Sequence, residues 1–375
     1  MNWIHEALQN LQRVDRLRDL RTLVPLDARR ALLDGREVRL FCGNDYLGLS
    51  QHPDVREAMS QASERHGMGP RGSALICGHT EEHRGLEADL AELKGSEAAL
   101  VFPTGFAVNL GVLAALGGPE TAFFSDALNH ASIIDGCRLA HGTVSVYRHR
   151  DVADLERLLS ESSAGRKVIV TDTIFSMEGS WAPLAELVEL KNRQGAILVI
   201  DEAHATLVHG PGGGGVADAL GLAGDIEFQV GTLSKAVGAQ GGYVATSAPA
   251  RKWLLNTARS YVFSTALPLP VVVAARAALS VARRDPSLRE TLRARIAQLS
   301  EDLGTPLTSP IASIVLGAEE RALEASAQLL EEGLLVPAIR PPTVPVGSAR
   351  LRVALSAAHS EQDVADLGRA LKRIS

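Results

Sequence analysis

The residue types best suited to chemistry follow two short runs that the sequence predicts to be buried strands. The run Ile197–Ile200 ends in Asp201, with His204 three residues later, and the run Glu227–Gly231 leads to Lys235. A lysine amine partly shielded from water has a lowered pKa and can form a Schiff base with a carbonyl compound. A carboxylate just beyond a strand can keep a cofactor's ring nitrogen protonated, which makes the ring a stronger electron sink.

Each of these residues also has a simpler explanation. Asp201 can cap the helix that follows it, and Lys235 can bind a phosphate or lie on the surface. A P-loop is not supported, because no Gly-x-x-x-x-Gly-Lys-[Ser/Thr] motif occurs. A dinucleotide site is not supported either, because no Gly-x-Gly-x-x-Gly opens a helix after the first strand.

Three more strand ends add complementary groups. Thr104, Gly105 and Phe106 join a strand to a helix, whose first N–H groups and dipole suit a phosphate. His130 follows the next strand and can stack on a flat ring, and Ser176 offers a hydroxyl after another. Taken singly, each is ordinary turn chemistry. Together, the five strand ends predict one cofactor site.

The elements that position these groups alternate between strands and helices. Amphipathic helical patterns separate the strands, so the sequence predicts an α/β fold with a mainly parallel central sheet flanked by helices. We expect an N-terminal arm at residues 1–44, a large domain at 45–280 and a small C-terminal domain at 281–375. The expected strands are Ala98–Phe102, Thr121–Ser125, Val144–Tyr147, Val168–Asp172, Ala196–Asp201, Glu227–Gly231, Gly242–Ala245, Ile311–Leu316 and Leu351–Leu355.

Composition narrows the class of protein. A net charge of −6 and 4% aromatic residues argue against a nucleic-acid or acidic-membrane partner. Arginines near the N-terminus form either a solvated helix face or a patch for an anionic substrate. The three cysteines include no Cys-x-x-Cys pair, so we expect neither disulfides nor a metal site. The N-terminus lacks a signal-peptide pattern and the longest apolar stretch is interrupted, so the expected location is the cytoplasm.

With these residues assembled, the chain resembles the α-oxoamine synthase family of fold-type I pyridoxal-phosphate enzymes. The resemblance runs from about residue 36 to the C-terminus and is carried by Gly43–Leu49, Asp201–His204 and Gly231–Lys235. It implies a fold-type I transferase with a smaller α+β C-terminal domain, and pyridoxal 5'-phosphate as cofactor. The segment Pro337–Arg352 looks most like the branch that joins L-alanine to a pimeloyl thioester, of coenzyme A or a carrier protein, in biotin synthesis.

The resemblance assigns roles to the cofactor-site residues. Lys235 carries the Schiff base and acts as general base, and Asp201 pairs with the pyridine nitrogen. His130 stacks on the ring, and His130 or His204 can hydrogen-bond a developing oxyanion. The other implied cofactor contacts are Thr104, Gly105, Phe106, Ser176, His204 and Thr232. Ser264 and Thr265 are expected to reach the phosphate from a neighbouring subunit, which implies a homodimer.

Substrate contacts are also implied. Arg352 is the expected clamp for the amino-acid carboxylate, with Arg350 as its rival. Arg21, Asn44 and Thr343 are expected to contact the acyl substrate, and His130 also faces the substrates.

The sequence departs from the family pattern at two places, and two alternative functions remain open. Gly69–Ser73 reads Gly-Pro-Arg-Gly-Ser where many relatives have Gly-Ser-Gly-Gly-Ser, which puts acyl preference in doubt. Asp172 stands where relatives often carry a glutamate. The nearest alternative is a condensing enzyme that uses glycine and a short acyl group, such as a glycine C-acetyltransferase. A non-catalytic partner subunit is disfavoured because Lys235 is present.

Overall fold

The computed structural model describes residues 2–374 and divides into two compact units. The large unit comprises residues 49–176 and 180–289, and the small unit comprises residues 2–48, 177–179 and 290–374. The expected domain limits near residues 44 and 280 are not tested by this division and stay predictions. None of the helices within residues 2–374 is long and apolar enough to cross a membrane.

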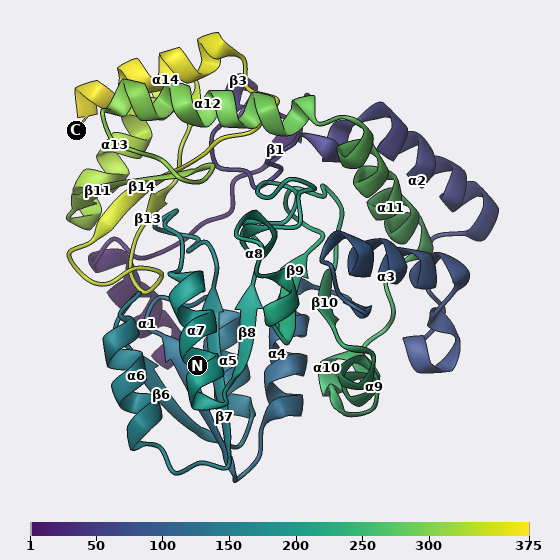
Figure 1. The fold of residues 1–375 in the computed structure, drawn as a ribbon. Coiled ribbons are helices and arrows are strands. Elements are labelled where there is room, and N and C mark those ends of the chain that lie inside the picture. Colours follow the sequence, from purple (N-terminus) through teal and green to yellow (C-terminus); the bar gives the residue numbers. More distant parts are fainter. Residues whose placement is uncertain (1, 375) are drawn as a thin grey trace. The chain divides into compact units, whose positions relative to one another are not determined.

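The large unit is built on a seven-stranded sheet (Figure 1). Its strand order is β4-β10-β9-β8-β7-β5-β6, and every neighbouring pair is parallel except the two that involve β10. The strands are β4 (Ala98–Phe102), β5 (Thr121–Asp126), β6 (Thr143–Tyr147), β7 (Arg166–Asp172), β8 (Ile197–Asp201), β9 (Phe228–Thr232) and β10 (Gly242–Thr246). The mainly parallel sheet is therefore confirmed, with each of its seven expected strands within two residues of its predicted ends.

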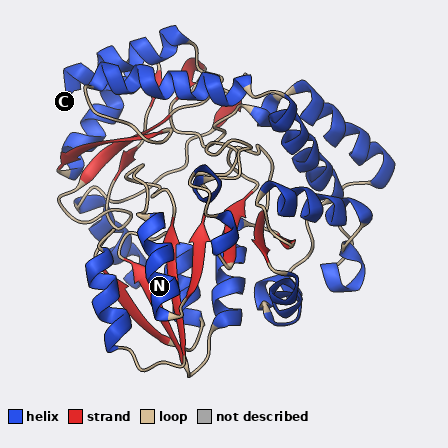
Figure 2. Cartoon of the chain, in the orientation of Figure 1, coloured by secondary structure: helices blue, strands red, loops and turns tan. Residues whose placement is uncertain are grey.

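Alternating apolar side chains bury both faces of this sheet, which is why its strands are almost continuously hydrophobic. On one face, Val168 and Val170 of β7 pack with α4, α5, α9 and α10, and on the other, Ile169 packs with α6, α7 and α8. Figure 2 shows these strands in red among the blue helices. The helices of the unit are α2 (Pro53–His66), α3 (Glu81–Leu93), α4 (Gly105–Leu116), α5 (Ala131–Leu139), α6 (Val152–Glu161), α7 (Leu184–Gln194), α8 (Val216–Ala219), α9 (Ala248–Thr257), α10 (Arg259–Val262) and α11 (Leu269–Arg284).

Local sequence signals set where α4 and α5 begin, and these two starts form part of the site. The Thr104 hydroxyl accepts the N–H of Ala107 (3.0 Å) at the start of α4, and His130 caps α5. Gly242 of β10 passes the first turn of α4 so closely that a Cβ there would lie 2.7 Å from the backbone nitrogen of Gly105. Only glycine allows this approach, which fixes the helix start against the sheet.

The small unit contains two short sheets. In the four-stranded sheet, β2 (Arg30–Leu33) pairs with β1 (Leu23–Pro25) and β3 (Arg36–Leu40), and β3 also pairs with β12 (Leu334–Leu335). In the other sheet, β14 (Ala349–Ala354) lies between β11 (Ile311–Gly317) and β13 (Ala338–Ile339). The helices are α1 (Asn2–Arg13), α13 (Glu319–Glu331), α14 (Glu361–Ile374) and most of α12 (Ser287–Leu303). This mixture of strands and helices confirms an α+β architecture, whereas the N-terminal strands β1–β3 were not foreseen.

Candidate active site

A cavity of about 270 Å³ opens in the large unit where strands β7, β8 and β9 end and helices α4 and α5 begin. This is the edge of an open α/β sheet at which ligands bind. The expected site residues among its lining are Thr104, Gly105, Phe106, His130, Asp201, His204, Thr232 and Lys235. The cavity also takes in Asn109, Ser132, Asp172, Ala203, Gly231 and Ser234.

Lys235 and His204 meet inside this cavity. The Nζ atom of Lys235 lies 2.8 Å from Nε2 of His204. His204 is buried in the turn that follows β8, and Lys235 follows β9, the neighbouring strand. The amine is therefore held by an imidazole that can share its proton, at the place where the sequence predicts a Schiff-base lysine.

Asp201 ends β8 and is buried among neutral hydrogen-bond donors. The backbone N–H of Ala203 donates to Oδ1 (2.8 Å), and the side-chain amide of Asn109 donates to Oδ2 (2.7 Å). Both donors are neutral, so neither is a counter-ion for the carboxylate. The carboxylate can therefore pair with a positively charged ring nitrogen.

A second carboxyl, that of Asp172, lies directly beside the first. Asp172 and Asp201 are paired residues on the adjacent parallel strands β7 and β8. Burial raises the pKa of Asp172 well above its usual value, and the nearby negative charge of Asp201 raises it further. One Asp172 oxygen accepts the backbone N–H of His130 (2.8 Å). Both effects favour the protonated form of Asp172 beside the Asp201 carboxyl group.

His130 is connected to Asp201 through two polar side chains. The amide of Asn109 donates to the hydroxyl oxygen of Ser132 (2.9 Å), and that hydroxyl lies 2.7 Å from Nδ1 of His130. Burial lowers the pKa of His130, so the ring is neutral near pH 7. Because Nδ1 accepts from Ser132, the remaining proton of the ring is on Nε2. His130 is thus an oriented neutral ring with one N–H to donate.

The start of α4 supplies the anion-binding part of the cavity. The first N–H groups of a helix have no partner within the helix and attract negative charge. A Cβ at Gly105 would lie 3.2 Å from the Thr232 side chain, so glycine keeps this corner open. The hydroxyl of Thr232 donates to Gly241 O (2.9 Å) and lies 2.7 Å from that of Ser234.

Three expected cofactor contacts are not among the residues that line the cavity. Ser176 follows β7 in the large unit and is half-buried. Ser264 and Thr265 instead line a small space beside His83 and Glu87. Their segment is tied to the preceding loop by a bridge between Ser73 and Thr265. A role for Ser264 and Thr265 in a neighbouring subunit therefore stays a prediction.

The expected substrate residues Arg21, Asn44, Thr343 and Arg352 belong to the small unit. Arg352 donates from Nη2 to the side-chain oxygen of Asn44 (3.1 Å), and the Tyr46 hydroxyl donates to the same oxygen (3.1 Å). Arg350, two residues away on β14, donates to the carboxylate of Glu178 (2.9 Å). Arg350 therefore has an anionic partner within the small unit, and the role of Arg352 as carboxylate clamp stays a prediction.

Thr343 and Arg21 are both exposed. The side chain of Arg18 donates to the Thr343 hydroxyl at 3.4 Å, so the N-terminal segment reaches the loop that carries Thr343.

Sequence reasoning overlooked Asn109, which joins Asp201 to Ser132. A signal for it exists, because Asn109 is the one amide-bearing residue in the otherwise apolar helix Gly105–Leu116. A buried polar residue in such a helix requires a partner. The other oversight is a buried ion pair, in which Lys94 Nζ lies 2.6 Å from the carboxylate of Glu202, the residue after Asp201.

Comparison with known proteins places this site in context. The family model of aminotransferase class I and II matches residues 36–371. The chain is 49% identical to the 8-amino-7-oxononanoate synthase of Arabidopsis thaliana, over 90% of the chain and 74% of that protein. It is 47% identical to the 8-amino-7-oxononanoate synthase of Anaeromyxobacter dehalogenans, over 97% of the chain and 93% of that protein.

Solved structures are similar over nearly the whole chain. A structure of SPT with PLP superposes with a TM-score of 0.94 at 31% identity, covering 99% of this chain and 96% of that one. The 8-amino-7-oxononanoate synthase of Francisella tularensis superposes with a TM-score of 0.77 at 27% identity, covering 90% and 96%. These similarities confirm the fold-type I architecture and the expected cofactor.

Proposed function

The chain belongs to the aminotransferase class I and II family and, within it, to the 8-amino-7-oxononanoate synthases, and we propose that it condenses L-alanine with a pimeloyl thioester. The products are 8-amino-7-oxononanoate, carbon dioxide and the free thiol carrier, as part of biotin synthesis. The observation that carries this proposal is the cavity that gathers Lys235, Asp201 and His130 from separate strand ends. The three cysteines of the chain are free thiols, which fits a cytoplasmic enzyme.

The cavity fits pyridoxal 5'-phosphate by the chemistry of its lining groups. It offers an amine at Lys235, a carboxylate at Asp201, a flat ring at His130 and a helix start at Gly105. These match the aldehyde, pyridine nitrogen, ring face and phosphate of the cofactor in turn. When bound, the cofactor supplies the electron sink for a carbanion at the amino-acid Cα.

Lys235 moves the proton in this scheme. Its amine removes the proton from Cα of alanine as a general base, a contribution typically of ~10²–10⁴-fold. His204, 2.8 Å from the amine, orients Nζ and shares its proton. Asn109 and Ala203 hold the Asp201 carboxylate in place by neutral hydrogen bonds and leave it available to pair with the ring nitrogen.

His130 and Arg352 orient the substrates. The Nε2–H of neutral His130 donates to the thioester oxygen as negative charge develops there. The guanidinium of Arg352 binds the alanine carboxylate with two parallel hydrogen bonds. Arg21, Asn44 and Thr343 contribute to the acyl-binding side, and Ser176 contributes to holding the cofactor.

We further propose that the enzyme is a homodimer whose sites are shared. Ser264 and Thr265 then contact the phosphate in the neighbouring subunit. Exposed apolar side chains near this segment support a subunit contact, since Phe263 is 72% and Ile76 is 82% exposed. Mixing Lys235→Ala with Thr265→Ala tests this, because hybrid dimers hold one intact site. Recovery of activity on mixing supports shared sites, and its absence in verified hybrid dimers contradicts them.

The reaction is tested by incubating the purified holoenzyme with alanine or glycine and a series of acyl-CoA thioesters. We expect alanine with pimeloyl-CoA to give the highest kcat/KM and a product with the mass of 8-amino-7-oxononanoate. Carbon dioxide and free thiol should appear in equal amounts. A clear preference for glycine with acetyl-CoA would contradict the proposal and favour a glycine C-acetyltransferase.

A further inference from the structure

The segment of the small unit that carries Asn44 has no helix or strand to hold it. Residues 41–48 follow β3 as bends, turns and irregular chain. Its carbonyl groups are instead bound by the last residue of β14 and by residues that follow this strand. The bonds run from Ala354 N to Phe41 O (2.9 Å), from Ser356 Oγ to Asp45 O (2.7 Å) and from Ala357 N to Tyr46 O (2.8 Å).

His359 connects the residues after β14 to the beginning of the segment that carries Asn44. Its Nε2 lies 3.1 Å from Leu40 O, and its Nδ1 accepts the backbone N–H of Ser356 (3.0 Å). Its ring stacks on Phe41, with centroids 4.3 Å apart and planes 24° apart. One nitrogen must donate and the other must accept, so these contacts require the neutral ring with its proton on Nε2.

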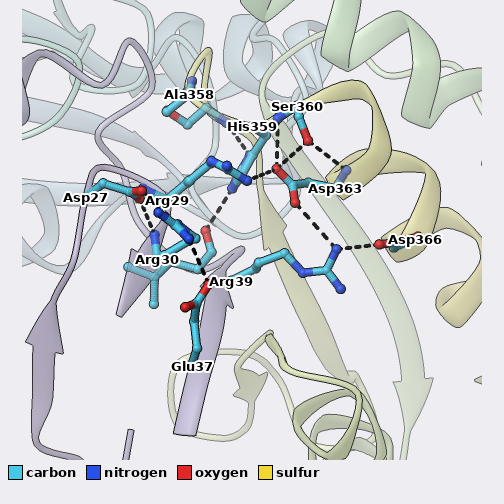
Figure 3. A network of polar contacts seen from close by, with 12 residues as sticks. Asp27, Arg29, Arg30, Glu37, Arg39, Ala358, His359, Ser360, Asp363 and Asp366 are labelled. Carbon is cyan, nitrogen blue, oxygen red and sulfur yellow. Dashed lines mark hydrogen bonds and ion pairs between the residues drawn. The ribbon is translucent and has the colours of Figure 1, made fainter. Parts of the chain in front are cut away.

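The charges around His359 are already paired with each other. Figure 3 shows the carboxylate of Asp363 between Arg29 and Arg39, with Asp366 on the far side of Arg39. Asp363 also accepts the N–H and hydroxyl of Ser360 (2.9 and 2.7 Å), next to His359 in the chain. Burial lowers the pKa of His359 to about 4, with Asp363 opposing the shift and the two arginines adding to it. The ring therefore stays neutral at physiological pH.

The held segment ends at the proposed carboxylate clamp. The side-chain oxygen of Asn44 accepts from Arg352 Nη2 (3.1 Å) and from the Tyr46 hydroxyl (3.1 Å). Burial raises the pKa of Tyr46 to about 12, so the phenol keeps its proton and remains a donor. The orientation of Arg352 thus depends on where the main chain places Asn44.

We propose that His359 is a positioning residue for the amino-acid substrate, which fixes the Leu40–Tyr46 segment so that Asn44 orients Arg352. His359 acts through Leu40 and Phe41 and does not itself touch the substrate. The inference rests on the proposed role of Arg352 as the carboxylate clamp. It predicts an effect on amino-acid binding, whereas a purely structural histidine would affect stability alone.

The test measures the Kd of the holoenzyme for L-alanine from the absorbance change of its bound cofactor. His359→Leu leaves Leu40 O and Ser356 N–H unpaired, and we expect alanine binding to weaken about tenfold. His359→Gln keeps a donor and an acceptor on one planar group and should recover most of the affinity. Bound cofactor per subunit should stay at the wild-type value in both variants.

Two further variants separate positioning from general destabilisation. Leu367→Ala opens a cavity on the buried face of α14, the helix that begins two residues after His359, and removes none of the hydrogen bonds that hold Leu40–Tyr46. It should lower the free energy of unfolding yet leave the Kd for alanine unchanged. Asn44→Ala combined with His359→Leu should bind alanine no more weakly than Asn44→Ala alone, because both changes remove the same support.

The outcomes distinguish this inference from its premise. Equal weakening by Leu367→Ala and His359→Leu, or additive effects of His359→Leu and Asn44→Ala, would overturn the positioning role. An unchanged Kd in a folded His359→Leu enzyme would also overturn it. If Arg352→Ala binds alanine normally while the condensation still proceeds, the proposed clamp is wrong and the reaction assignment stands.

Discussion

The two groups of functional residues are held in place by different means. In the large unit, Asp201 ends β8 and Lys235 follows β9, the neighbouring parallel strand, so the sheet itself brings them to one edge. In the small unit, Arg352 lies on a strand, but its partner Asn44 lies on an irregular segment tethered by residues from the far end of the chain. The first site is fixed by sheet topology and the second by individual tertiary hydrogen bonds.

This difference predicts how each site responds to mutation. A site fixed by topology should tolerate the loss of a single tether but depend on the charge of each side chain. A site fixed by tethers should lose substrate affinity when a remote hydrogen bond is removed. The variants below test this contrast, beginning with the largest expected effect.

The buried ion pair of Lys94 and Glu202 should be the most sensitive support of the large unit. Lys94 and Glu202 are completely buried, and Lys94 also donates to Gly214 O. Lys94→Met leaves the Glu202 charge unpaired, so we expect the free energy of unfolding to fall by about 3–5 kcal/mol. Urea unfolding measures this loss. Lys94→Met combined with Glu202→Leu should recover part of it, and a double variant as unstable as the single one would contradict the explanation.

The paired carboxyls Asp201 and Asp172 should respond unequally to the same substitution. Asp201→Asn replaces the carboxylate that pairs with the ring nitrogen by a neutral amide, and we expect kcat to fall by about 10²–10³-fold. Asp172→Asn replaces a carboxyl whose raised pKa favours the neutral form, so kcat should change far less. Steady-state kinetics on both variants, with cofactor content checked by absorbance, measures the difference. Equal losses would show that Asp172 also carries a charge.

Acid should weaken the small unit through His359. Its pKa is about 4 in the folded protein and 6.5 in the unfolded chain. Below pH 6.5 the unfolded chain binds a proton that the folded protein does not bind until about pH 4. Stability is therefore lost as pH falls between these values, by an amount of about 3 kcal/mol. Urea unfolding at several pH values should show this slope in the wild type and a shallower one in His359→Gln. Identical pH slopes in the wild type and in His359→Gln would contradict the role assigned to His359.

The two arginines of β14 should separate binding from stability. Arg352→Lys loses the planar fork, so we expect the KM for alanine to rise about tenfold with a smaller change in kcat. Arg350→Lys disturbs the pair with Glu178 and should affect stability more than KM. Kinetics with alanine varied at saturating thioester measures both. A larger KM change in Arg350→Lys would show that Arg350, and not Arg352, binds the substrate carboxylate.

The same contrast explains how much the sequence could predict. The strands before Asp201 and Lys235 were recognised because short apolar runs with polar ends are local signals. The hydrogen bond from Asn109 to Asp201 could not be predicted in this way, because it joins residues 92 positions apart. His359 and Leu40 are 319 positions apart, and neither belongs to a motif that indicates the other. Contacts of that range arise from tertiary packing, which periodicity and turn signals do not encode.

The central claim is that Lys235 bonds covalently to pyridoxal 5'-phosphate, and borohydride reduction tests it most directly. The reduced holoenzyme is digested and its peptides are identified by mass spectrometry, with Lys252→Ala as the matched control. We predict one modified lysine, Lys235, in both the wild type and the control. Modification at another lysine, or an unmodified Lys235 in cofactor-loaded enzyme, would contradict the account.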